Sequence, residues 1–219
     1  MERKLFNQFT LKKRKNWQTN QLTNLKSRAT AVVTFAMLLF FGISNTANAQ
    51  VAYTENFNSG LNGWSTNWLS STVLVCEGTN SVRKNIYTSG TQGNFESPSV
   101  GTSNGGAITM TFQYKVVDWP AASAATPATF GTINVQYSAS AAGPWATVHT
   151  IGSANHTPSA SCATVTVPSF SAGPGAMFVR FECVYGTGDY YLYFDDINIS
   201  QGLPPSCVQP AAVAATNVT

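Results

Sequence analysis

Residues 108–116 read Ile-Thr-Met-Thr-Phe-Gln-Tyr-Lys-Val, and this stretch decides the fold class. Its apolar side chains occupy every second position, with Thr, Gln and Lys between them. Successive side chains of a β-strand point to opposite faces of the sheet. The period of two therefore predicts a strand with one buried face and one polar face.

Four further stretches show the same alternation. Their same-parity members are Ile133, Val135 and Tyr137; Val165 and Val167; Met177, Val179, Phe181 and Cys183; and Tyr191, Tyr193, Asp195, Ile197 and Ile199. Turns rich in glycine and proline separate the stretches, and nothing after residue 50 has the 3.6-residue period of an amphipathic helix. The pattern predicts an all-β, two-sheet antiparallel sandwich over about residues 51–200. A chain of that length can bury a full core between two sheets.

The first 49 residues have the order of a secretory signal peptide. Eight of the 12 basic residues lie in the first 28 positions, and the apolar run Ala31–Ile43 follows them. The segment ends in Ala47-Asn48-Ala49, a small-residue cleavage site. Because a membrane span needs about 20 apolar residues, an uncleaved anchor is the less favoured alternative. We predict cleavage before Gln50, a secreted or cell-surface protein, and no transmembrane anchor after cleavage.

The remainder of the chain is sparsely charged and acidic. Only 10% of all residues are charged, against about 25% in typical globular proteins, which argues against a coiled coil, a helical bundle or a charged disordered tail. After Ala49 there are four basic and eight acidic residues, hence a formal net charge of −4. Nucleic-acid binding requires a folded basic patch, so no nucleic-acid partner is expected.

All four cysteines, Cys76, Cys162, Cys183 and Cys207, follow the predicted cleavage site. An even number in an oxidising compartment predicts disulfides and no free thiolate, but the sequence leaves all three pairings open. Their spacing excludes a Cys-x-x-Cys zinc or redox motif.

The character of the chain changes after Ser200. Residues 201–210 form a proline-rich linker, since repeated proline blocks both strand pairing and helix. Residues 211–219 suit one strand with no partner strand after it. We interpret them as the opening of a further, truncated domain.

Several short motifs resemble known domains. Five short motifs of this chain resemble MAM-like (meprin-type) and related lectin-like jelly-roll domains. They are the opening Tyr53-Thr54-Glu55-Asn56-Phe57 with Gly63-Trp64, the segment Glu96-Ser97-Pro98-Ser99, the strand from Met110 to Tyr114, the segment Gly143-Pro144-Trp145, and the ending Tyr193-Phe194-Asp195-Asp196-Ile197. The order of the motifs carries the resemblance, which covers about residues 51–200 and implies a jelly-roll sandwich. The cysteine positions depart from the MAM pattern. The tail from Pro204 resembles the linker and first strand of a fibronectin type III domain.

A structural calcium site is the first candidate site. The parity of Asp195 with Ile197 and Ile199 predicts a carboxylate aimed at the core, which must be protonated, paired or bound to a cation. The resemblance to jelly-roll carbohydrate-binding modules implies a structural Ca²⁺ held by Glu55 and Asp195, with Asp196 nearby. Carboxylate and carbonyl oxygens suit this ion. The alternative is a bulge or strand end that lets both aspartates reach solvent.

A platform of aromatic rings is the second candidate site. Trp68, Trp119 and Trp145 lie beside turn residues, where exposed rings can stack on the apolar faces of sugars. Large aromatic side chains are equally the usual filling of a sandwich core, and for Trp64 we favour the core.

Catalysis has little support, and no catalytic residue is predicted. Neither His149 nor His156 belongs to a recognised nucleophile or metal motif. Glu182 could act with a second carboxylate in a glycan hydrolase of lectin-like fold, provided that it faces Glu96, Asp118 or Asp189 across a cleft. We predict a non-catalytic recognition or adhesion module that binds a polysaccharide, a cell-surface glycan or a glycoprotein. The alternative is a structural spacer, in which Trp119 and Trp145 would be buried.

Overall fold

A computed structural model of the chain describes residues 50–89 and 93–205. The predicted signal peptide (1–49) and the predicted start of a fibronectin-like domain (211–219) lie outside the described residues. Of the predicted linker, Gln201 belongs to the last strand and residues 202–205 follow it without regular structure.

The described residues form eleven strands and one short 3₁₀ helix. In chain order these are β1 (Ala52–Glu55), β2 (Leu69–Ser71), β3 (Ser81–Ile86), β4 (Gly93–Glu96), β5 (Gly101–Ser103), β6 (Ala107–Asp118), η2 (Ala128–Phe130), β7 (Gly131–Ser138), β8 (Ala146–Ile151), β9 (Ala163–Ser171), β10 (Gly175–Tyr185) and β11 (Tyr190–Gln201). No helix within these ranges is long and apolar enough to cross a membrane.

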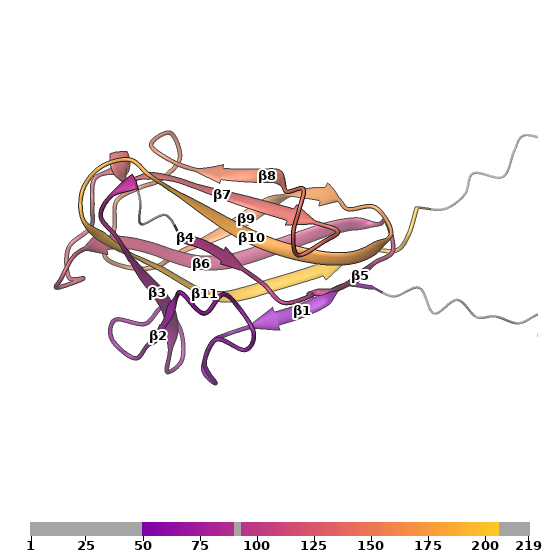
Figure 1. The fold of residues 1–219 in the computed structure, drawn as a ribbon, viewed down its shortest axis with the longest axis horizontal. Helices are drawn as coiled ribbons and strands as arrows, with labels where there is room; N and C mark the ends of the chain where they lie inside the picture. Colours follow the sequence, from indigo (N-terminus) through magenta and orange to yellow (C-terminus); the bar gives the residue numbers. More distant parts are fainter. Residues whose placement is uncertain (1–49, 90–92, 206–219) are drawn as a thin grey trace, which may run out of the picture. The chain divides into compact units, whose positions relative to one another are not determined.

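The strands build two antiparallel sheets that pack face to face (Figure 1). The six-stranded sheet has the order β2-β3-β11-β6-β9, with β1 paired to β11. The five-stranded sheet has the order β4-β10-β7-β8, with β5 paired to β10. The prediction of an all-β jelly-roll sandwich is therefore confirmed.

The core lies between the sheets, where the predicted alternation places it. Ile108, Met110, Phe112, Tyr114 and Val116 of β6 are buried on one face, as are the predicted apolar residues of β10. Aromatic rings fill the centre: Phe181 and Phe194, from opposite sheets, stack at 4.3 Å between centroids. Trp64 stacks on Phe95 at 4.5 Å, which confirms Trp64 as a core residue.

The last strand departs from the predicted parity. In β11 the side chains of Leu192 and Phe194 enter the core, so Tyr193 and Asp195 lie on the outer face. The register with β6 shifts between Asp195 and Asn198, and Asp196 has a φ of +45°. A bulge reverses the alternation there, which returns Ile197 to the core. Asp195 thus does not share a face with Ile197.

Candidate functional site

The outer face of the five-stranded sheet carries an ordered set of polar side chains. Residues paired directly across antiparallel strands point to the same face. Arg180 of β10 pairs with Glu96 of β4 on one side and with Gln136 of β7 on the other. Two residues further along β10, Glu182 pairs with Asn94 of β4 on one side and with Asn134 of β7 on the other. Because Val179 and Phe181 fill the core, Arg180 and Glu182 must face outward.

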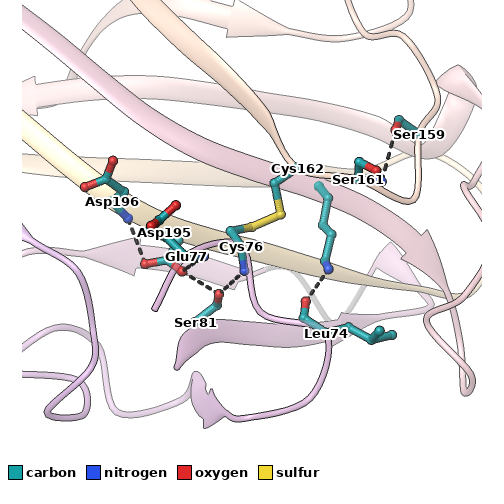
Figure 2. Close-up of a disulfide and its surroundings, with 10 residues drawn as sticks. Leu74, Cys76, Glu77, Ser81, Ser159, Ser161, Cys162, Asp195 and Asp196 are labelled. Atoms are coloured by element: carbon teal, nitrogen blue, oxygen red, sulfur yellow. Dashed lines mark hydrogen bonds between the residues drawn. A yellow bond between two sulfur atoms is a disulfide. The ribbon is translucent and has the colours of Figure 1, made fainter. Parts of the chain in front are cut away.

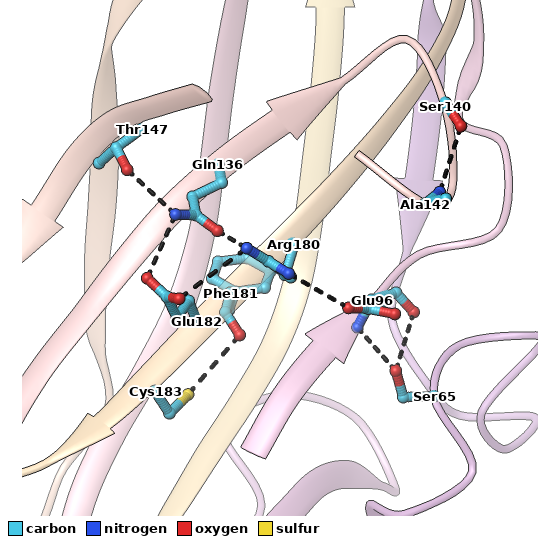
Figure 3. Close-up of polar contacts among 10 residues, drawn as sticks. All are labelled: Ser65, Glu96, Gln136, Ser140, Ala142, Thr147, Arg180, Phe181, Glu182 and Cys183. Carbon is cyan, nitrogen blue, oxygen red and sulfur yellow. Dashed lines mark hydrogen bonds and ion pairs between the residues drawn. The ribbon is translucent and has the colours of Figure 1, made fainter. Parts of the chain in front are cut away.

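Hydrogen bonds and ion pairs join Glu96, Gln136, Arg180 and Glu182 into one network (Figure 3). The Nε of Arg180 donates to Gln136 at 2.7 Å, and its guanidinium lies 3.6 Å from Glu96 and 3.9 Å from Glu182. The amides of Asn134 and Gln136 donate to Glu182 at 2.9 and 3.2 Å. Each side chain therefore has a fixed position, and the network holds one cation between two carboxylates.

Trp145 adds an aromatic ring to this network. It precedes β8, and the guanidinium carbon of Arg180 lies 4.6 Å from the centroid of its ring. Gly143 has a φ of +85°, and a Cβ there would lie 2.9 Å from the Trp145 ring, so only glycine fits the turn. Trp145 remains partly exposed. We call Glu96, Asn134, Gln136, Trp145, Arg180 and Glu182 the Arg180 face.

The Arg180 face has the chemistry needed to bind a polyhydroxylated ligand. Carboxylate and amide oxygens accept hydrogen bonds from hydroxyl groups, while guanidinium and amide N–H groups donate to them. An indole ring offers a flat apolar surface. The sequence pattern indicates Trp145 as a site residue but not Arg180, Gln136 or Asn134. Their only signal was their parity, opposite to the buried residues of β10 and β7.

Two of the three predicted tryptophans do not join this site. Trp119 follows β6 in the six-stranded sheet and is 48% exposed. Trp68 is 1% exposed and packs against both Phe95 and Phe194, at 4.7 and 5.4 Å between ring centroids. The prediction that Trp68 belongs to an exposed binding platform is therefore wrong, because its side chain is buried in the core.

Asp195, the central predicted calcium ligand, is held by hydrogen bonds (Figure 2). Asp195 is fully buried beneath the segment from Leu74 to Ser81. Its Oδ2 accepts from Ser81 Oγ at 2.6 Å and from the Glu77 amide at 3.0 Å, and its Oδ1 accepts from the Asp196 amide. Burial raises the pKa of Asp195, and these hydrogen bonds oppose the rise. The bulge predicted as the alternative is present at Asp196, but Asp195 does not reach solvent.

Glu55 and Asp196 make separate contacts. Glu55 ends β1 opposite Ile197, and its Oε1 accepts from the Phe57 amide and from Asn62. Asp196 accepts from Asn198. Among the described residues no three His, Cys, Asp or Glu side chains gather as metal ligands. Any cation beside these carboxylates would take its further ligands from backbone, amide or water oxygens.

The disulfide Cys76–Cys162 ties the segment that covers Asp195 to the start of β9. Lys115 donates to the Leu74 carbonyl of the same segment and lies 4.7 Å from the centroid of the Tyr193 ring. The expectation that the cysteines pair does not hold for Cys183 within the described residues, where it forms no disulfide and is buried in the core. Cys207 lies outside the described residues.

The carboxylates needed for a hydrolase are distributed over both sheets. Glu182 and Glu96 flank the same guanidinium, whereas Asp118 ends β6 and Asp189 immediately precedes β11, both in the other sheet. A hollow of about 340 Å³ lies elsewhere, among β1, β6 and β11. Small polar side chains line much of it, including Thr54, Thr109 and Ser200, and it contains no carboxylate.

No protein-family model and no curated protein matches the chain. Solved structures of similar shape include the C-terminal family 22 carbohydrate-binding module of Clostridium thermocellum Xyn10B, with 16% identity and a TM-score of 0.43 over 71% of this chain and 94% of that one. The CBM22-1 xylan-binding domain of Paenibacillus barcinonensis Xyn10C has 14% identity and a TM-score of 0.46 over 68% and 92%. The K3 adhesin domain of Lys-gingipain from Porphyromonas gingivalis W83 has 14% identity and a TM-score of 0.44 over 70% and 99%.

Proposed function

We propose that residues 50–205 are a non-catalytic, extracellular carbohydrate-binding module that holds a polysaccharide or cell-surface glycan on the Arg180 face. The observation that carries the proposal is the partly exposed ring of Trp145, fixed against Arg180 at the edge of a row of amides and carboxylates. The ring would stack on a sugar, and the row would hydrogen-bond to its hydroxyl groups.

Two features favour recognition over a structural spacer. A spacer would bury Trp119 and Trp145, yet the first is about half exposed and the second partly exposed. The Arg180 face also holds charged and amide side chains in a connected network on the outer surface, where they can bind the hydroxyl groups of a ligand. Arg180 forms ion pairs with both Glu96 and Glu182, an arrangement that suits binding better than acid–base hydrolysis.

Secretion belongs to the same proposal. The signal-like order of residues 1–49 and the disulfide Cys76–Cys162 both fit an oxidising compartment. The finer kinship with MAM-like domains and a following fibronectin type III domain stays a prediction from the sequence motifs.

Calcium is proposed only as a structural ion. It would lie beside Asp195, with Asp196 as the next acid along β11. Glu55, the other predicted ligand, pairs with Ile197 and so lies on the opposite face of the six-stranded sheet from Asp195. An ion there would stabilise the charged form of a buried carboxylate and add to the hydrogen bonds from Ser81 and Glu77.

The test is a titration of the full chain with soluble xylan, β-glucan, galactan and mannan, followed by calorimetry. We expect Trp145→Ala to weaken binding about tenfold or more, the effect of losing about 1.4 kcal/mol of stacking. Leu69→Ala is the matched control, because Leu69 is 64% exposed on β2 of the other sheet. The proposal fails if the wild-type chain binds none of these polymers at millimolar sugar concentration, or if Trp145→Ala and Leu69→Ala behave alike.

A further inference from the structure

One end of the six-stranded sheet presents two exposed aromatic rings. Tyr190 of β11 pairs with Ile86 of β3 on one side and with Asp118 of β6 on the other. The residues one step beyond this row are Tyr87, Asp189 and Trp119. Tyr87 is 51% and Trp119 is 48% exposed, and Asp189 between them is exposed. We call these three residues and Asn85 the tip.

The backbone and polar side chains of the tip are ordered. The Trp119 amide donates to the Asp189 carbonyl at 3.2 Å. The Asn85 amide donates to Asp189 Oδ1 at 2.7 Å and to the Tyr190 carbonyl at 3.2 Å. Because neighbouring strands lie about 4.8 Å apart, the Cα atoms of Tyr87 and Trp119, which flank β11, are about 9.5 Å apart.

The tip lies at the far end of the sandwich from both ends of the described chain. Val51 bonds to Gln201, and β1 pairs with the last residues of β11, so the chain enters and leaves at one end. Tyr190 is at the other end of this 12-residue strand, about 36 Å away at 3.3 Å per residue. Figure 1 shows β1 and β5 at the opposite end from the turn that joins β10 to β11. Covalently joined neighbours therefore attach away from the tip.

The chemistry of the tip favours a sugar over an apolar protein segment. An apolar partner needs a continuous apolar surface, whereas here a carboxylate and an amide separate the rings. Asp189 Oδ2 and Asn85 Oδ1 are acceptors that hydroxyl groups can use. Tyrosine and tryptophan combine an apolar ring with a polar edge, which suits the mixed faces of a sugar.

We propose that the tip is a second glycan-binding site, independent of the Arg180 face, that stacks Trp119 and Tyr87 on two alternate sugars of an extended chain. Asp189 and Asn85 hydrogen-bond to hydroxyl groups of the sugar between them. The two sites lie on different sheets, so one module can hold two glycan segments and cross-link them. The proposal goes beyond the function given above, and it holds whether or not the Arg180 face binds sugar.

The experiment follows the indole N–H signals of the full chain by NMR while xylohexaose, and separately cellohexaose, is added. The signals of Trp119 and Trp145 are identified by their loss in Trp119→Ala and Trp145→Ala. We expect both signals to shift, with about two binding sites per chain. At the tip, Trp119→Ala or Tyr87→Ala should weaken binding about tenfold and leave the Trp145 response unchanged.

Each outcome decides between the two sites. A shift of the Trp145 signal alone overturns glycan binding at the tip and leaves the proposed function standing. A shift of the Trp119 signal alone supports glycan binding at the tip and overturns binding at the Arg180 face. No shift of either signal overturns both. Leu69→Ala, which removes another exposed apolar side chain of the six-stranded sheet, should bind as the wild type does. If xylose binds the tip as tightly as xylohexaose, the two-ring arrangement is wrong.

Discussion

Arg180 and Trp145 form a cation–π pair, with the guanidinium carbon 4.6 Å from the centroid of the indole ring. The pair joins the middle of β10 to the residue that precedes β8, so it fixes a turn against the sheet. Arg180 also bonds to Gln136 and pairs with Glu96 and Glu182, and these contacts hold the guanidinium in the orientation that the ring requires.

We predict that the energies of this pair are coupled. Arg180→Ala and Trp145→Ala should each lower the free energy of unfolding, and the double variant should lower it by about 0.5–1 kcal/mol less than the sum, the usual strength of a partly exposed cation–π contact. Urea unfolding of the four proteins measures this difference. Arg180→Lys should not restore the coupling energy with Trp145, because lysine lacks the planar guanidinium group. Additive effects of the two alanine variants would show that the contact contributes nothing.

The disulfide Cys76–Cys162 should contribute strongly to stability. It joins residues 86 positions apart. In the simplest model a cross-link over a loop of that length lowers the entropy of the unfolded chain and so stabilises the fold by about 4–5 kcal/mol. We therefore expect Cys76→Ser/Cys162→Ser to unfold at clearly lower urea concentration. Reducing agent should lower the midpoint of the wild type and leave that of the double variant unchanged. Equal midpoints for the reduced and oxidised wild type would contradict the prediction.

Cys183 should remain unreactive in the folded protein. Burial raises the pKa of its thiol well above the ordinary value, and only the thiolate is nucleophilic. In a Cys207→Ser background, a thiol reagent should label Cys183 only when urea unfolds the chain. Labelling at the same rate with and without urea would mean that the core opens readily around β10.

The sequence predicted the sandwich because alternation reports directly which face of a strand is buried. The strands around Phe112, Val135 and Phe181 each kept one parity from end to end, so their buried residues were correct. The prediction for the last strand was wrong at Asp195, because Asp196 has a positive φ and the alternation of faces reverses there. Neither the spacing of apolar residues nor their strand propensity indicates such a bulge.

The site was less predictable than the fold for a related reason. Trp68 and Trp145 both follow turn residues, and nothing local distinguishes them. Trp68 meets Phe95 and Phe194 from distant strands and is buried, whereas Trp145 meets Arg180 and stays partly exposed. Gln136 and Arg180 became neighbours through the β7–β10 register, which involves residues 44 positions apart.

Calcium, if bound at Asp195, should stabilise the fold. A ligand that binds only the folded state at about 100 times its Kd adds about 2.7 kcal/mol, a rise of several degrees in Tm. We expect Tm to fall when the chain is treated with EDTA and to recover with Ca²⁺ but not with Na⁺. Asp195→Ala should abolish the response, and Glu96→Gln, on the other sheet, should retain it. An unchanged Tm in chain verified as metal-free would leave Asp195 as a carboxylate held by hydrogen bonds alone.

His156 should make the fold sensitive to mild acid. Its ring is buried, with Nδ1 2.8 Å from the Tyr114 hydroxyl, 5.0 Å between its centroid and that of Phe130, and no hydrogen-bond partner for Nε2 among the described residues. Burial lowers the pKa of His156 below its unfolded value of about 6.5. Between these two pKa values the unfolded chain binds more protons than the folded chain, so the free energy of unfolding is highest above about pH 6.5 and falls as the pH drops.

The slope due to this one group can reach about 1.4 kcal/mol per pH unit. Urea unfolding between pH 7.5 and pH 5 (roughly the range in which a histidine titrates) measures it. His156→Gln keeps a partner for the Tyr114 hydroxyl without titrating in this range, so it should remove most of the slope. His149→Gln is the matched control, because His149 is a less buried histidine on β8. If His156→Gln keeps the wild-type slope while His149→Gln loses it, the acid sensitivity belongs to the surface of the five-stranded sheet and not to the core.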